Sequence, residues 1–263
     1  MGEETSRRIG EIQALQAGFD EGLWLVDTAE LYADGGAEKV IGEAIRDVRD
    51  RVFLTTKVWP THGTMTGIGE SMAASLKRLQ TDYVDLYLLH WPSKDYPLEE
   101  SMAGLMDVLH QGMTRHIGVS NFPRSLWEQA LALTDGAVGV NQVDFSLGVR
   151  TSELSLMSCA AQHHASLMAY SPVRNVLGDE LDSSRRNVLT RIAQTHGVSL
   201  SAVALAWLLN PRKAEVVVIA KASHVTHVRD NAKVLSCRLN RQECAELETL
   251  YPLPSLDLAL EAY

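Results

Sequence analysis

The chain is poor in cysteine. Its 263 residues include only Cys159, Cys237 and Cys244, and no two of them form a C-x-x-C pair. An odd and widely spaced set argues against a disulfide framework and fits a reducing compartment. The polar N-terminus, MGEETSRRIG, has no apolar segment of the kind found in a secretory signal. We therefore expect a cytoplasmic protein.

Long apolar runs and an excess of positive charge are missing as well. No segment approaches the roughly 18 consecutive apolar residues that a membrane span requires. With 24 Lys and Arg against 33 Asp and Glu, the formal net charge is −9. Nucleic acids and anionic membranes bind basic surfaces, so neither is expected as the main partner. A local cationic pocket for a phosphate is still compatible with this balance.

Strand-like and helix-like segments alternate along the chain. Short apolar runs predict strands at 23–27, 52–57, 84–89, 116–119, 138–143, 166–170 and 216–220. Apolar residues at helical spacing predict helices at about 5–19, 37–48, 69–79, 98–110, 124–133, 151–163, 185–195, 199–209 and 225–235. Asn240 and Glu243 have the spacing of a capping box and predict the start of one more helix. Repeated strand–helix units predict a parallel sheet with helical crossovers.

Polar residues follow nearly every predicted strand: Asp27, Lys57, His90, Ser120 with Asn121, Gln142, Tyr170 with Ser171, and Lys221. A doubly wound sheet concentrates its ligands at one switch point, whereas a closed barrel collects them from all its strand ends. We therefore predict an α/β fold, a (β/α)8 TIM barrel, as a single domain over residues 1–263. Seven strands are recognisable and the chain begins with a helix, so we expect the first barrel strand to be missing.

Three blocks share one pattern, in which an apolar run ends abruptly in ionisable residues: LWLVDTAELY (23–32), RVFLTTKVWP (51–60) and VDLYLLHWP (84–92). The ionisable residues are Asp27, Tyr32, Lys57 and His90. Each of them alone is more often a cap or an ion-pair partner than a catalytic residue. Their occurrence at three successive strand ends favours one shared catalytic site.

The four residues suit the donation of a proton to a carbonyl oxygen. A free phenol has a pKa of about 10, and a neighbouring ammonium lowers the pKa of a phenol. Lys57 can supply that ammonium, and Asp27 can hold Lys57 charged and oriented. His90 can hydrogen-bond the substrate oxygen. We expect Tyr32 to be the general acid as a hydride reaches the carbonyl carbon.

A dense and ordered series of segments extends this pattern along the chain: VDTAELYADGGAEKVIGEAI (26–45), FLTTKVWP (53–60), SLKRLQTDYVDLYLLHWP (75–92), HIGVSNF (116–122), NQVDF (141–145), MAYSPV (168–173), HGVSLSAVALAWLL (196–209) and VIAKASHVTHVRDN (218–231). Together these segments resemble the aldo-keto reductase superfamily, and most closely its bacterial methylglyoxal-reductase and diketogluconate-reductase types. The resemblance implies NADPH-dependent reduction of small aldehydes or ketones to alcohols, with methylglyoxal as a candidate substrate. It also implies Tyr32 as the general acid, with Asp27, Lys57 and His90 as its partners.

The same resemblance implies how the cofactor is held. NADPH is expected without a Rossmann domain, and the chain has no G-x-G-x-x-G motif. Ser120, Asn121 and Gln142 are expected to hydrogen-bond the nicotinamide carboxamide, because their groups pair with an amide without charge. Tyr170 is expected to stack on the nicotinamide ring.

The phosphates and the adenosine are assigned by resemblance to the loop SPVRNVL (171–177), with Ser171 and Val173 in it, and to Lys221, Ser223 and Asn231. Two positions depart from the family pattern. Ala220 stands where Pro is usual, and His227 stands where an Arg often clamps the 2′-phosphate. A neutral imidazole is a poorer phosphate ligand than a guanidinium. We still expect NADPH rather than NADH.

Trp59 and Trp91 each follow a predicted catalytic residue closely and are expected to line the substrate pocket. No H-x-x-x-H motif or Cys/His cluster occurs, so no metal is expected. We expect a monomer rather than an obligate oligomer. The missing strand leaves an alternative open, a nucleotide-binding protein with the reductase fold but weak catalysis, because its loss exposes the edges of neighbouring strands.

Overall fold

The computed structural model describes residues 1–176, 181–211 and 215–255. They group into two compact units. The first unit is Met1–Asn141 with Ala222–Val225, and the second is Gln142–Lys221 with Thr226–Tyr263. The single-domain expectation stays a prediction.

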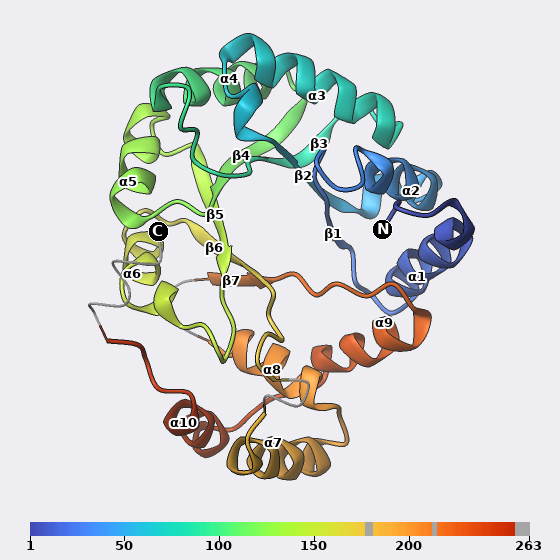
Figure 1. Cartoon of the computed structure of the whole chain (residues 1–263), viewed down its shortest axis with the longest axis vertical. Coiled ribbons are helices and arrows are strands. Elements are labelled where there is room, and N and C mark those ends of the chain that lie inside the picture. Colours follow the sequence, from blue (N-terminus) through green and yellow to red (C-terminus); the bar gives the residue numbers. More distant parts are fainter. Residues whose placement is uncertain (177–180, 212–214, 256–263) are drawn as a thin grey trace. The chain divides into compact units, whose positions relative to one another are not determined.

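The first unit alternates helices and strands. Its elements are η1 (Thr5–Arg7), α1 (Arg8–Asp20), β1 (Leu25–Asp27), α2 (Gly36–Ile45), η2 (Arg49–Arg51), β2 (Phe53–Val58), η3 (Pro60–His62), α3 (Met65–Leu79), β3 (Val84–Leu89), α4 (Leu98–His110), β4 (Thr114–Ser120) and α5 (Arg124–Leu133), where η denotes a 3-10 helix. Strand β5 (Val138–Asp144) begins in this unit and ends in the second. Helices α1 to α4 pack side by side in chain order, as Figure 1 shows.

The second unit continues the alternation. Its further elements are η4 (Thr151–Glu153), α6 (Leu156–Gln162), β6 (Ser166–Tyr170), α7 (Ser183–His196), α8 (Leu200–Leu208), β7 (Glu215–Val218), α9 (Val225–Ala232), η5 (Lys233–Leu235) and α10 (Arg241–Leu250). The described residues thus contain seven strands, the number that the sequence predicts. None of the described helices has the length and apolarity that crossing a membrane would require.

Neighbouring strands follow the chain order, from β1 to β5 in the first unit and from β5 to β7 in the second. The pairings β1–β2, β2–β3, β3–β4 and β6–β7 are parallel. Parallel strands bring their carboxyl ends to the same edge of the sheet. Asp27 lies opposite Thr55, and Lys57 lies opposite Leu88. This register places the polar residues that end β1, β2 and β3 beside one another.

Several predicted elements have the observed bounds, including the strands at 84–89 and 166–170 and the helices at 98–110 and 124–133. Helix α3 begins four residues earlier than predicted, because the Thr64 side chain accepts a hydrogen bond from Gly67 N and caps the helix there. The predicted segments 151–163 and 225–235 each split into an α-helix and a 3-10 turn. The capping box of Asn240 and Glu243 is confirmed.

An ion pair between the fully buried Glu38 and the partly exposed Arg78 packs against β2. Glu38 of α2 is fully buried and accepts hydrogen bonds from Thr56 Oγ1 at 2.6 Å and Arg78 Nε at 2.5 Å. Arg78 also donates to Ser75 Oγ at 3.0 Å. Because Thr56 immediately precedes Lys57, this network fixes the strand that delivers Lys57 against α2 and α3.

Replacing Glu38 with Ala is expected to destabilise the protein by about 3–5 kcal/mol, because it leaves Arg78 largely buried without its carboxylate. Urea denaturation measures the change. Glu70→Ala, which removes an exposed carboxylate from α3, is the control and should change stability by no more than about 0.5 kcal/mol. Equal midpoints for Glu38→Ala and wild type would contradict the bracing role.

Candidate active site

A lysine with no solvent exposure lies at the centre of the site. Lys57 Nζ donates to Asp27 Oδ2 at 2.6 Å and to the carbonyl oxygen of Thr28 at 2.7 Å. The Lys57 side chain is 0% exposed and that of Asp27 is 7% exposed. Burial penalises an unpaired charge severely, so the carboxylate and the carbonyl together stabilise the ammonium.

Tyr32 lies above this ion pair, on the turn that joins β1 to α2. Lys57 Nζ is 5.1 Å from the centre of its ring. The ring meets that of His90 edge to face, with centroids 5.7 Å apart and an angle of 81° between the planes. Tyr32 is 39% exposed, so it is open to a substrate while its ring contacts both partners. The structure therefore brings together all four residues of the predicted catalytic set.

The turn after Tyr32 has an unusual backbone. Ala33, Asp34 and Gly35 have φ values of 52°, 48° and 76°, so three successive residues are left-handed. A left-handed conformation costs free energy in residues other than glycine, and surrounding contacts must impose it. A Cβ atom on Gly35 would lie 2.4 Å from Cδ of Arg78. The Arg78 side chain, which pairs with the buried Glu38, thus packs closely against this turn and requires a glycine there.

His90 is buried next to the lysine. Its ring also meets the Trp59 ring edge to face, at 5.2 Å and 87°. Burial, and to a lesser extent the positive charge of Lys57, lowers the pKa of His90 to about 3. His90 Nδ1 is buried and has no hydrogen-bond partner among the described residues. The imidazole is therefore neutral near physiological pH and suited to hydrogen bonding rather than to carrying charge.

Ser120 and Asn121, predicted at the cofactor, adjoin this group. Both are buried, and Asn121 Nδ2 donates to the carbonyl oxygen of His90 at 3.2 Å and to Ser120 Oγ at 3.0 Å. Asn121 has a φ of 62°. Asn141, which was not predicted from the sequence, is fully buried. Its amide donates to the carbonyl oxygen of Phe122, the residue after Asn121, at 2.8 Å. Its position directly before Gln142 was the available signal.

The pocket residues predicted from the sequence, Trp59 and Trp91, follow the ends of β2 and β3 closely in the chain. Trp59 contacts His90, and Trp91, which follows His90, is 43% exposed. Leu31 was not predicted, but it precedes Tyr32 and is 44% exposed. The signal available in the sequence was a large apolar residue directly before Tyr32, the predicted general acid. Exposed apolar side chains beside a polar centre are typical of a small-molecule site.

The remaining cofactor residues lie mainly in the second unit. Gln142 is buried and its amide nitrogen lies 2.9 Å from Met168 Sδ. Tyr170 ends β6, and Ser171 follows it with a φ of 51°. Ser171 and Val173 are partly exposed.

Lys221 is exposed and Asn231 is partly exposed, whereas the partly exposed Ser223 belongs to the first unit. Residue 177 of the predicted phosphate loop lies outside the described residues. These cofactor assignments stay predictions.

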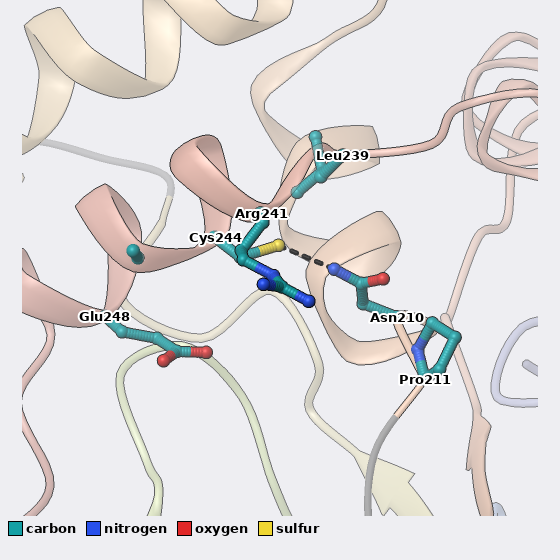
Figure 2. A pocket seen from close by; sticks show the side chains of 7 residues that line it. Asn210, Pro211, Leu239, Arg241, Cys244 and Glu248 are labelled. Atoms are coloured by element: carbon teal, nitrogen blue, oxygen red, sulfur yellow. Dashed lines mark hydrogen bonds between the residues drawn. The ribbon is translucent and has the colours of Figure 1, made fainter.

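A cavity of about 410 Å³ lies within the second unit (Figure 2), and none of the residues that line it is a predicted site residue. It is lined by Asn210, Pro211, Leu239, Arg241, Cys244, Ala245 and Glu248. Asn210 Nδ2 donates to Cys244 Sγ at 2.6 Å. Glu248 also accepts from the indole nitrogen of Trp207 at 3.3 Å. These two hydrogen bonds join the end of α8 to α10, so the residues around the cavity serve to pack the two helices together.

A family model described as the Aldo/keto reductase family matches residues 3–252. The chain belongs to this family. It is 40% identical to the Escherichia coli K12 protein named methylglyoxal reductase YeaE, over 99% of this chain and 91% of that protein. It is 29% identical to the methylglyoxal reductase DkgB of Escherichia coli O157:H7, over 88% and 84% of the two chains.

Solved structures agree with this membership. A Klebsiella pneumoniae aldo/keto reductase in complex with NADP and acetate superposes with a TM-score of 0.89 at 40% identity, covering 97% of this chain and 89% of that one. The thermostable reductase Tm1743, crystallised with the inhibitor epalrestat, superposes with a TM-score of 0.87 at 38% identity, over 94% and 89%. These likenesses confirm the predicted TIM-barrel class with seven recognisable strands.

The low pKa of His90 has a consequence for stability. Its pKa is depressed on folding, so the unfolded chain binds a proton that the folded chain rejects between about pH 6.5 and 3. Stability is therefore expected to fall as pH falls from 6.5 towards 4, and His90 contributes at most about 1.4 kcal/mol per pH unit. Urea denaturation at several pH values should show a shallower slope for His90→Gln.

His110→Gln is the matched control, because it removes an exposed histidine at the end of α4. Its slope should stay close to that of wild type. An identical slope in wild type and His90→Gln would show that His90 is not held neutral by the fold.

Proposed function

We propose that the protein is an NADPH-dependent reductase that converts small aldehydes or ketones to alcohols. One observation carries the proposal: the buried ammonium of Lys57, paired with Asp27, lies under the ring of the exposed Tyr32. Two relatives are named methylglyoxal reductases, which makes methylglyoxal the first substrate to test. Klebsiella pneumoniae reductases in complex with NADP and with NADPH support the cofactor.

The residues of this chain fit the cofactor chemically. Ser120 and Asn121 are buried beside His90 and offer a hydroxyl and an amide, which are neutral groups suited to a carboxamide. Tyr170 offers an aromatic plane, and the exposed ammonium of Lys221 suits a phosphate. When bound, NADPH supplies the hydride. The chain itself has to orient the carbonyl, exclude water and move one proton.

Tyr32 donates its hydroxyl proton to the carbonyl oxygen as the new C–H bond forms and the C=O π electrons move to oxygen. The positive charge of Lys57 stabilises the phenolate that remains. Neutral His90 donates a hydrogen bond to the same carbonyl oxygen and stabilises the developing negative charge. Solvent then returns a proton to Tyr32, which its exposure permits. Trp59 and Trp91 bound the pocket.

Tyr32→Phe tests the proton donor. It is expected to lower kcat for methylglyoxal by at least about 100-fold, because it removes the general acid and keeps the ring contacts. The decrease in NADPH absorbance measures the rate. Tyr83→Phe is the control, since Tyr83 stacks with Arg49 and Arg115 before the start of β3 and its ring is retained.

Equal rates for wild type and Tyr32→Phe would contradict the assignment of the acid. Quenching of tryptophan fluorescence by NADPH, without turnover of methylglyoxal or 4-nitrobenzaldehyde by wild type, would favour the alternative of a nucleotide-binding protein with weak catalysis.

Lys221→Ala tests the phosphate assignment. It is expected to weaken NADPH binding by about 10-fold and to change NADH binding by less than about 2-fold, because only NADPH carries the 2′-phosphate. Fluorescence titration gives both affinities. Lys233→Ala, which removes an exposed lysine paired with Asp230, should change neither. Equal wild-type affinities for NADPH and NADH would contradict the role of Lys221.

A further inference from the structure

Glu30 lies two residues before Tyr32, on the turn that follows β1. Its side chain is 11% exposed. Its Oε1 atom accepts a hydrogen bond from the backbone N–H of Trp59 at 2.7 Å and lies 3.0 Å from His62 Nδ1. The backbone N–H of Glu30 donates to the carbonyl oxygen of Lys57 at 3.2 Å. Glu30 thus joins the turn that carries Tyr32 to the segment that carries Lys57 and Trp59.

The carboxylate holds the backbone of Trp59, a residue whose ring contacts His90. The Trp59 ring meets the His90 ring edge to face at 5.2 Å. Trp59 ends the extended backbone after β2 and directly precedes the 3-10 turn η3. A hydrogen bond from an amide to a carboxylate is shorter and stronger than one between neutral groups. The backbone of Trp59 is therefore held by a side chain from another strand end.

The link extends outward to α3. His62 Nδ1, which lies near Glu30, is also 3.0 Å from Ser71 Oγ. The His62 side chain is 53% exposed, so it adds a solvent-exposed outer contact rather than a buried ion pair. The contact of Glu30 with the backbone amide of Trp59 is partly buried, whereas its contact with His62 is exposed. Neither contact of the Glu30 carboxylate involves Asp27, Lys57 or Tyr32.

We propose that Glu30 is a positioning residue that holds Trp59 against His90 and thereby sets the affinity of the site for its carbonyl substrate. The proposal rests on the proposed reductase function. Glu30 acts through Trp59 and touches no reacting atom, so it affects substrate binding more than proton transfer. Removing the carboxylate frees the Trp59 backbone and loosens the indole wall, while the Lys57–Asp27 pair is left intact.

Two variants distinguish the hydrogen-bond acceptor of Glu30 from its negative charge, because Glu30→Ala removes both and Glu30→Gln removes only the charge. Glu30→Ala is expected to raise KM for methylglyoxal by about 10-fold and to change kcat by less than about 3-fold, the pattern for loss of an interaction that contributes equally to substrate and transition-state binding. Glu30→Gln keeps an oxygen that can accept from Trp59 N–H, so its KM should stay within about 3-fold of wild type. Glu70→Ala, on the exposed face of α3, should leave both constants unchanged.

A double-mutant cycle identifies the residue through which Glu30 acts. In a Trp59→Ala background, Glu30→Ala should raise KM by less than about 2-fold, because the group that it positions is gone. An undiminished effect in that background would overturn the proposal. So would an unchanged KM in Glu30→Ala, or a Glu30→Gln variant as impaired as Glu30→Ala.

The amide proton of Trp59 gives a readout that does not need turnover. Its hydrogen exchange, followed by NMR, should be slow in wild type and in Glu30→Gln and at least about 10-fold faster in Glu30→Ala. Equal exchange in all three would overturn the contact. If wild type turns over no carbonyl compound, the proposed reductase function fails. In that case, equilibrium dialysis with 4-nitrobenzaldehyde tests the positioning role without turnover, by measuring the Kd of this aldehyde. Equal Kd values for wild type and Glu30→Ala would overturn the role of Glu30.

Discussion

The buried ion pair of Lys57 and Asp27 is the interaction on which the site depends. An ammonium with no solvent exposure is stable only if charge and hydrogen-bond acceptors surround it, and Asp27 and the Thr28 carbonyl supply them. These partners come from the end of β1, whereas the lysine comes from the end of β2. The pair therefore requires parallel strands in register, and any slip of β1 against β2 would separate the two charges.

The position of Tyr32 over this ion pair depends on the turn that carries the tyrosine. It lies on a turn of three successive left-handed residues, Ala33 to Gly35, and such a turn persists only where packing imposes it. The Arg78 side chain beneath Gly35 and the buried Glu38 provide that packing. The left-handed turn is unfavourable by itself, but in the folded chain it holds the ring of Tyr32 over the buried ammonium of Lys57.

The same burial has opposite consequences for the two basic groups. Lys57 has a carboxylate at 2.6 Å, and this contact offsets the desolvation of its charge. His90 has no such partner and lies near the lysine, so burial and charge repulsion both lower its pKa. One group is a fixed cation and the other a neutral hydrogen-bonding group. This division is what a site needs if it is to stabilise a phenolate and a developing alkoxide at once.

The sequence by itself determined the alternation of strands and helices, the strand ends that carry Asp27, Lys57 and His90, and the residue types available for proton donation. The sequence determined these features because apolar periodicity, helix caps and polar residues at strand ends can be recognised within short segments. Only the tertiary structure decided the neutrality of His90, the left-handed turn after Tyr32, and the contact between Glu30 and Trp59. Each of these depends on groups that lie far apart in the chain, as Glu30 and Trp59 do at a separation of 29 positions. No local pattern encodes the distance at which such groups meet.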